Sequence, residues 1–192
     1  MHQILITCRE ASIASIPLIP IYIILNRYYF QDSKRSLYCL LFSIYLGAMY
    51  AAVGLPDITY YRYSPRYNFI PFYYMFSAWE TTLLNVILFL PLGFFLPVLW
   101  SRMNSFVKTA GFGFCVSLFI EILQIFTYRA TDINDIMTNT FGTCVGFLFG
   151  SAALKHLPNI APIESKQDFS VVFGSALAVM FFIYPFIIAA LQ

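Results

Sequence analysis

The chain has 192 residues and a formal net charge of +2; 60% of its residues are hydrophobic and only 10% are charged. A soluble domain carries about 25% charged residues, so this composition excludes an ordinary soluble globular protein and indicates a membrane protein. The small net charge gives no reason to expect a nucleic-acid partner.

Six apolar segments are candidates for membrane spans, each of which needs about 20 predominantly apolar residues. They cover approximately residues 4 or 12–26, 37–55, 83–100, 109–126, 135–154 and 169–191. The first is the weakest, because Arg9 and Glu10 interrupt it and Pro17 and Pro20 are expected to kink it. We therefore predict an all-α, polytopic membrane helix bundle with about six transmembrane helices, or five if the first segment does not span.

These segments divide the chain into three parts. Residues 1–66 hold two spans and the start of an aromatic connection, residues 67–154 form a core of three transmembrane helices, and residues 155–192 hold a last span. The connections after spans one, three and five carry seven Lys and Arg residues, and the opposite side carries four. Because Lys and Arg favour the cytoplasmic side, the polar join at 128–134 is predicted to be extracellular.

Polar residues recur at helical spacing on both sides of this join. At 100° per residue, Glu121, Gln124, Asp132, Asp135 and Asn139 fall within an arc of roughly 80°. A carboxyl group is costly inside a bilayer. Glu121 must therefore become protonated, find a cation or line a watery cavity, unless it forms a structural hydrogen bond between spans.

The join itself has two interpretations, and both stay open at this stage. In the first, Thr131 or Asp132 caps the following helix and Asp135 is favourable in its first turn. In the second, the two carboxylates and Arg129 grip a polar head group, bind a divalent cation or exchange a proton.

Further along, three glycines at four-residue intervals predict close packing against another helix. They are Gly142, Gly146 and Gly150. Asn139, on the same stripe, needs a hydrogen-bonding partner, for which Glu121 or Asn85 of the third span is suitable.

The long connection before the third span is rich in aromatic residues, as is common at membrane interfaces. Its Arg62 and Arg66 are four residues apart and are expected to meet lipid phosphates or a phosphorylated ligand. The four cysteines are far apart and the two histidines are solitary, so we expect no Cys/His metal site and no cofactor.

Five segments, taken in order and spacing, resemble the VanZ-like family over approximately residues 67–150. They are Asn68-Phe-Ile-Pro-Phe72, Asn85-Val-Ile-Leu-Phe-Leu-Pro-Leu-Gly93, Ile120-Glu-Ile-Leu-Gln124, Arg129-Ala-Thr-Asp-Ile-Asn-Asp135 and Asn139-Thr-Phe-Gly142. The resemblance implies a role in a Gram-positive cell envelope and low-level resistance to the glycopeptide teicoplanin. It implies characteristic polar positions without a catalytic role, namely Asn85, Glu121, Gln124, Arg129, Asp132, Asp135 and Asn139.

These inferences together predict a multi-pass cell-membrane protein with an outward-facing polar pocket. The seven positions would line the pocket, with Arg62 and Arg66 at its mouth. Besides the lipid bilayer, the expected partner is a lipid-linked envelope precursor or a glycopeptide. Three other functions stay open: an enzyme acting on a lipid or its head group, a small transporter or flippase, and a scaffold that packs its glycine stripe against a partner.

Overall fold

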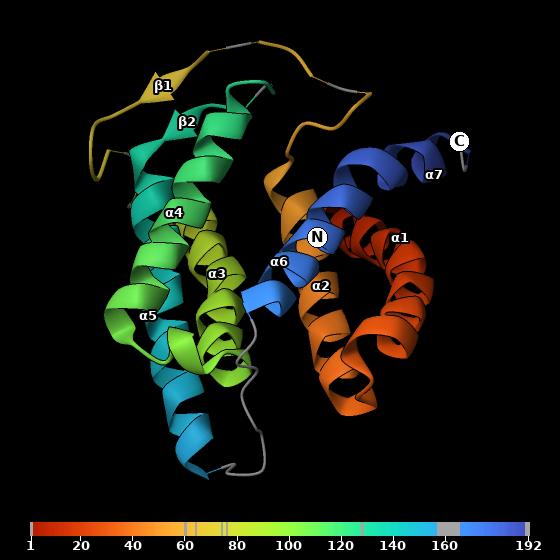
Figure 1. Cartoon of the computed structure of the whole chain (residues 1–192). Coiled ribbons are helices and arrows are strands. Elements are labelled where there is room, and N and C mark those ends of the chain that lie inside the picture. The colour runs from red at the N-terminus through yellow and green to blue at the C-terminus, as the bar shows by residue number, and fades with distance from the viewer. Residues whose placement is uncertain are drawn as a thin grey trace. The chain divides into compact units, whose positions relative to one another are not determined.

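A computed structural model describes residues 2–59, 61–63, 65–73, 75, 77–127, 129–156 and 166–190 of the chain. The helices are α1 (His2–Leu25), α2 (Ser33–Val53), α3 (Trp79–Leu99), α4 (Phe106–Gln124), α5 (Ile133–His156), α6 (Lys166–Ala178) and α7 (Tyr184–Ala190) (Figure 1). Shorter elements are the π-helical η1 (Asn26–Phe30) and η3 (Val179–Ile183), the 3-10 helix η2 (Ser101–Met103), and the strands β1 (Tyr67–Asn68) and β2 (Thr131–Asp132). The predicted all-α class is confirmed.

Every predicted span lies on a helix or a helical run, with ends that differ by a few residues. Within the described part of the chain, four helical segments are long and apolar enough to cross a membrane. They are Ser33–Val53, Trp79–Leu99, Phe106–Gln124 and Gln167–Ala190. α1 and α5 have sufficient length, at 24 residues each, so a multi-pass helix bundle is established and the total of six spans stays a prediction.

The chain forms two compact units. Residues 1–61 and 165–192 make up the terminal unit, and residues 62–164 make up the central unit.

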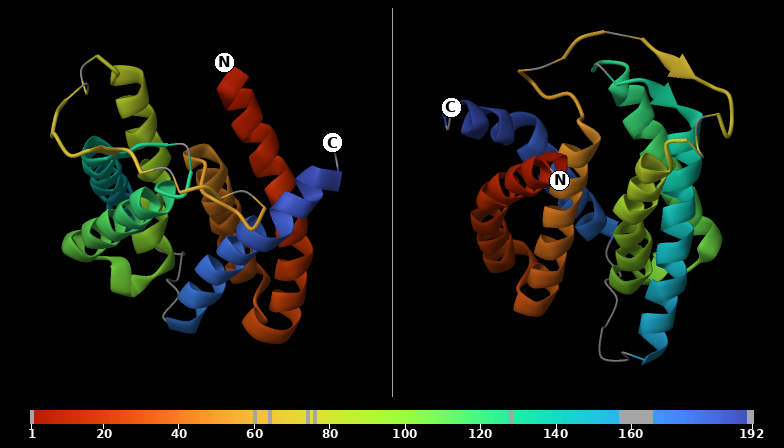
Figure 2. Two further views of the ribbon diagram at one scale, coloured as in Figure 1. Left: turned by 90° about the horizontal axis from the view of Figure 1, so that it is seen from above. Right: turned by 180° about the vertical axis from the view of Figure 1, so that it is seen from behind.

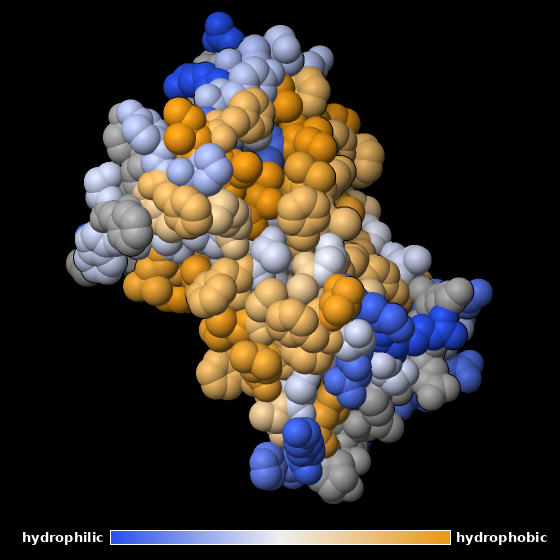
Figure 3. Space-filling view, turned by 90° about the vertical axis from the view of Figure 1, so that its left-hand side faces the viewer, coloured by the Kyte–Doolittle hydropathy of each residue, from blue (hydrophilic) through white to orange (hydrophobic). Residues whose placement is uncertain are grey.

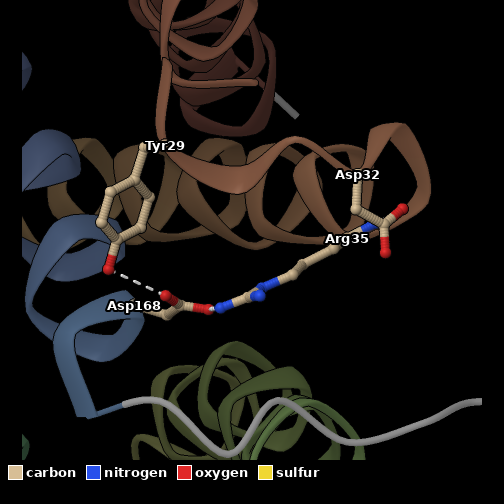
Figure 4. Close-up of polar contacts among 4 residues, drawn as sticks. All are labelled: Tyr29, Asp32, Arg35 and Asp168. Carbon is tan, nitrogen blue, oxygen red and sulfur yellow. Dashed lines mark hydrogen bonds and ion pairs between the residues drawn. The ribbon is translucent and has the colours of Figure 1, made fainter. Parts of the chain in front are cut away.

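In the terminal unit, α1 packs along α2, and α2 packs against α6. α1 continues through Pro17 and Pro20, where the sequence predicted a kink, and its ribbon is bowed rather than broken (Figure 2). An ion pair between Arg35 of α2 and the buried Asp168 of α6 joins those two helices, and the Tyr29 hydroxyl donates a hydrogen bond of 3.0 Å to the same carboxylate (Figure 4).

In the central unit, α5 packs closely against α3 and also contacts α4. A Cβ added at Gly142, Gly146 or Gly150 would collide with the backbone of α3. The glycine stripe therefore permits a close helix approach, as predicted. Because α3 of the same chain covers the stripe, the scaffold hypothesis, in which the stripe meets a separate partner, is wrong.

The outer surfaces of these three helices are strongly apolar. Exposed side chains include Leu83, Leu84, Ile87, Phe114, Phe119, Ile122, Phe141, Leu148 and Phe149. Figure 3 shows an apolar belt across one face of the molecule, with hydrophilic side chains gathered toward its ends. Such a surface is stable in contact with lipid and not with water.

Candidate functional site

The polar residues of the join lie at one end of the central unit, where α4 ends and α5 begins (Figure 1). Asp132 is the residue directly before α5, and its Oδ1 accepts a hydrogen bond of 2.8 Å from the Asn134 N–H. This bond is that of a helix N-cap. Asp132 Oδ2 accepts a second hydrogen bond, of 3.0 Å, from Asn68 Nδ2. The capping interpretation of Asp132 is therefore confirmed.

Glu121 is 1% exposed and faces the join from the last turn of α4. Its Oε2 accepts a hydrogen bond of 2.8 Å from the Asp132 N–H, and its carbonyl accepts one of 3.0 Å from the Thr131 hydroxyl. The carboxyl group thus binds a backbone donor that would otherwise be unpaired at the start of α5. Of the roles considered for Glu121, the structure shows the hydrogen bond that ties two spans together.

Asp135 lies one turn further along, in the first turn of α5, and is half-buried. Its Oδ1 accepts a hydrogen bond of 2.7 Å from Asn85 Nδ2 of α3. The side chain of Arg129 is exposed. The hydrogen bond between Asn85 and Asp135 joins α3 to α5 at this end.

Asn139 is 3% exposed, and its partner is neither Glu121 nor Asn85, so that prediction is wrong. Its Nδ2 donates a hydrogen bond of 2.9 Å to Ser117 Oγ, and its Oδ1 has no hydrogen-bonding partner among the described residues. The physical reason is depth, because Asn139 lies one turn further from the join than Asp135. Ser117, one turn before Glu121 on the same face of α4, is at the matching level.

Gln124 is 4% exposed at the last residue of α4. Its carbonyl accepts hydrogen bonds from both the N–H and the hydroxyl of Thr127, each at 3.0 Å. These bonds close the turn that follows the helix. Gln124 therefore belongs to the same polar end as Glu121.

Asn134 was not singled out from the sequence, although it lies inside the quoted join motif. It is 6% exposed; its Oδ1 accepts a bond of 2.6 Å from the Phe72 N–H, and its Nδ2 donates one of 3.1 Å to the Tyr73 carbonyl. Phe72 has a φ of 64°, a conformation that is unfavourable for a non-glycine residue. Asn134 thus holds a strained turn of the aromatic connection against the start of α5.

The aromatic connection also pairs with the join through its backbone. The Arg62 N–H donates a hydrogen bond of 2.8 Å to the Phe126 carbonyl, and the Arg66 carbonyl accepts one of 2.9 Å from the Thr131 N–H. Directly afterwards, β1 and β2 pair in parallel. The side chains of Arg62 and Arg66 are exposed, as is that of Arg129, so three arginines lie on adjacent backbone segments.

The predicted site residues therefore form one polar end of the central unit. Glu121, Asp132 and Asn139 make hydrogen bonds within the fold, and the side chains of Arg62, Arg66 and Arg129 are exposed. Over the described part of the chain, no three His, Cys, Asp or Glu side chains come together in a group that could hold a metal ion. Guanidinium groups are donors that suit anions such as phosphate.

A family model described as VanZ/LLP1 matches residues 37–155, which is more than half of the chain. "Protein VanZ" of Enterococcus faecium is 36% identical over 102 residues, which cover 52% of this chain and 60% of that protein. This chain thus spans less than two thirds of the length of that relative. No solved structure matches. The protein is a multi-pass membrane protein that belongs to the VanZ/LLP1 family.

Proposed function

We propose that the polar end of the central unit faces the outside of the cell, binds the phosphate-bearing head group of a cell-envelope lipid, and so lowers susceptibility to teicoplanin. The observation that carries the proposal is the placement of three exposed arginines on paired backbone segments. The backbone of Arg62 is hydrogen-bonded to that of Phe126, and the backbone of Arg66 to that of Thr131. Phe126 and Thr131 precede and follow Arg129 in the sequence. Guanidinium groups present planar forks of donors that match phosphate oxygens.

The groups behind these arginines suit a polar head group. Asp135 and Asn85 are half-buried and bonded to each other at 2.7 Å. Their remaining acceptor and donor capacity is available to hydroxyl and amide groups of a ligand. Glu121 and Asp132 are engaged in holding α4 to α5, so we assign them a positioning role.

Exposed aromatic side chains near this end support a lipid ligand. Tyr61, Tyr63 and Phe69 of the same connection, and Trp79 at the start of α3, are each at least 60% exposed. Aromatic side chains of this kind sit at the level of lipid head groups. The excess of Lys and Arg in the opposite connections favours the extracellular side for this end, where the precursors of the cell wall are exposed.

Catalysis on a lipid head group is the second function that the sequence left open. Two of the three carboxylates that it would use, those of Glu121 and Asp132, accept hydrogen bonds from backbone N–H groups. One oxygen of Glu121 and both oxygens of Asp132 thus hold parts of the fold together. A general acid or base must be free to reach the substrate, so this arrangement supports binding better than acid–base chemistry.

The experiment is to express the full chain in a Gram-positive host and to measure the inhibitory concentrations of teicoplanin and vancomycin. The test variant is R62Q/R66Q/R129Q. The matched control is R102Q/K108Q/K155Q, which also removes three exposed positive charges, all from the central unit and outside the polar end. We expect the wild type and the control to reduce teicoplanin susceptibility and the test variant to lose the effect at equal membrane levels.

Two results would contradict the proposal. If the wild type changed neither inhibitory concentration at verified membrane levels, the proposed resistance would be wrong. If the triple arginine variant were as protective as the control, the arginines would not be the binding surface.

A further inference from the structure

The terminal unit contains a groove that the proposed function does not use. It lies between α1 and α2 and has a volume of about 180 Å³. Ile19, Ile23, Leu37 and Leu40 make its walls apolar. Ile19, Ile23 and Leu37 are 47%, 66% and 52% exposed, so the walls are open to the surroundings of the unit.

One end of the groove is polar, because Asn26 and Ser33 line it there. Asn26 Nδ2 donates a hydrogen bond of 3.3 Å to Ser33 Oγ, which closes the turn between the two helices. Asn26 Oδ1 is buried and has no hydrogen-bonding partner among the described residues. A buried amide oxygen without a donor is unfavourable, and a ligand hydroxyl group would satisfy it.

Basic residues stand next to this polar end. Arg27 and Lys34 directly follow Asn26 and Ser33 in the sequence, and both are exposed. The third basic residue of the turn, Arg35, is already paired with Asp168 (Figure 4). The Asp32 carboxylate accepts hydrogen bonds from the Lys34 and Arg35 N–H groups, at 3.0 and 3.3 Å, as the cap of α2.

We propose that this groove binds an anionic phospholipid of the bilayer. An acyl chain lies along the apolar walls, the phosphate group pairs with Arg27 and Lys34, and a head-group hydroxyl donates a hydrogen bond to Asn26 Oδ1. The groove has apolar walls and, at one end, both hydrogen-bonding and cationic groups. A phospholipid likewise combines apolar chains with a polar, charged head group. This site belongs to the terminal unit and does not depend on the arginines of the central unit.

The test is to titrate lipid into the purified full-length protein in nonionic detergent and to measure the bound lipid by native mass spectrometry. The probes are phosphatidylglycerol, which is anionic and carries hydroxyls, and phosphatidylcholine, which is zwitterionic. Each basic residue contributes roughly 1 kcal/mol to binding an anionic lipid surface, so R27Q/K34Q is expected to bind phosphatidylglycerol about 30-fold more weakly. The control R102Q/K108Q removes the same charge elsewhere and is expected to bind as the wild type does.

A second variant tests the groove itself. I23W places a bulky side chain in the wall without changing charge, and it is expected to weaken phosphatidylglycerol binding while the thermal unfolding temperature stays that of the wild type. Equal binding of both lipids by the wild type would overturn the proposal. It would also be overturned if R102Q/K108Q weakened binding as much as R27Q/K34Q, or if stably folded I23W bound normally.

Discussion

The contact between α5 and α3 makes a quantitative prediction at Gly146. An alanine Cβ at this position would collide with the Leu90 carbonyl oxygen and would come too close to the Phe94 amide nitrogen. Both obstacles are backbone atoms of a helix, so no side-chain rotation can relieve the collision. The two helices would have to separate over their whole contact.

The cost can be estimated from two opposing effects. Overpacking costs about 1–3 kcal/mol, and rigid backbone on both sides favours the upper half of that range. Replacing a helical glycine by alanine returns about 1 kcal/mol of helix propensity. G146A is therefore expected to lower the free energy of unfolding by about 1–2 kcal/mol.

The chain offers a matched control at Gly111. This glycine is also helical, in α4, but apart from its neighbours in the chain and the nearby backbone of its own helix, no atom of the described residues lies within 4 Å of an added Cβ. G111A is expected to gain about 0.5–1 kcal/mol. The unfolding temperatures of both variants, measured by circular dichroism in the same detergent, distinguish the two expected effects. An unfolding temperature for G146A equal to that of G111A would refute close backbone packing at this stripe.

Three further predictions concern polar groups. D132A removes the cap of α5 and is expected to destabilise the protein by about 0.5–2 kcal/mol, measured by thermal unfolding. D132N is expected to lose less, because its amide oxygen still caps α5 although its NH2 group cannot accept the hydrogen bond from Asn68 Nδ2. E121Q keeps an acceptor for the Asp132 N–H and should remain within about 1 kcal/mol of the wild type, whereas E121A leaves a buried donor unpaired and should cost about 1–3 kcal/mol; equal losses would contradict the structural role. D168N leaves Arg35 beside a neutral amide and is expected to cost about 3 kcal/mol, and the double variant R35M/D168L should recover most of that loss in chemical denaturation.

The sequence was sufficient for features that depend on one segment at a time. The length and apolar content of each segment predicted the helix bundle, because a span must satisfy its own backbone hydrogen bonds in lipid. The spacing of Gly142, Gly146 and Gly150 predicted a closely packed helix face. Asp132 before an apolar helix was compatible with a cap, although a capping aspartate and a ligand-binding one have the same local sequence.

Only the tertiary structure decided which side chains of different segments form hydrogen bonds with one another. Whether Asn139 meets Glu121, Asn85 or Ser117 depends on the axial offset and rotation of α5 against α4, which no single helix encodes. The contact of Asn68 with Asp132 joins residues 64 positions apart and follows from the parallel pairing of β1 with β2. The sequence was enough to predict that polar groups gather at this end. It could not predict which of them bond within the fold and which are exposed, because a hydrogen bond requires its two atoms to lie within about 3 Å, and only the packed helices set those distances.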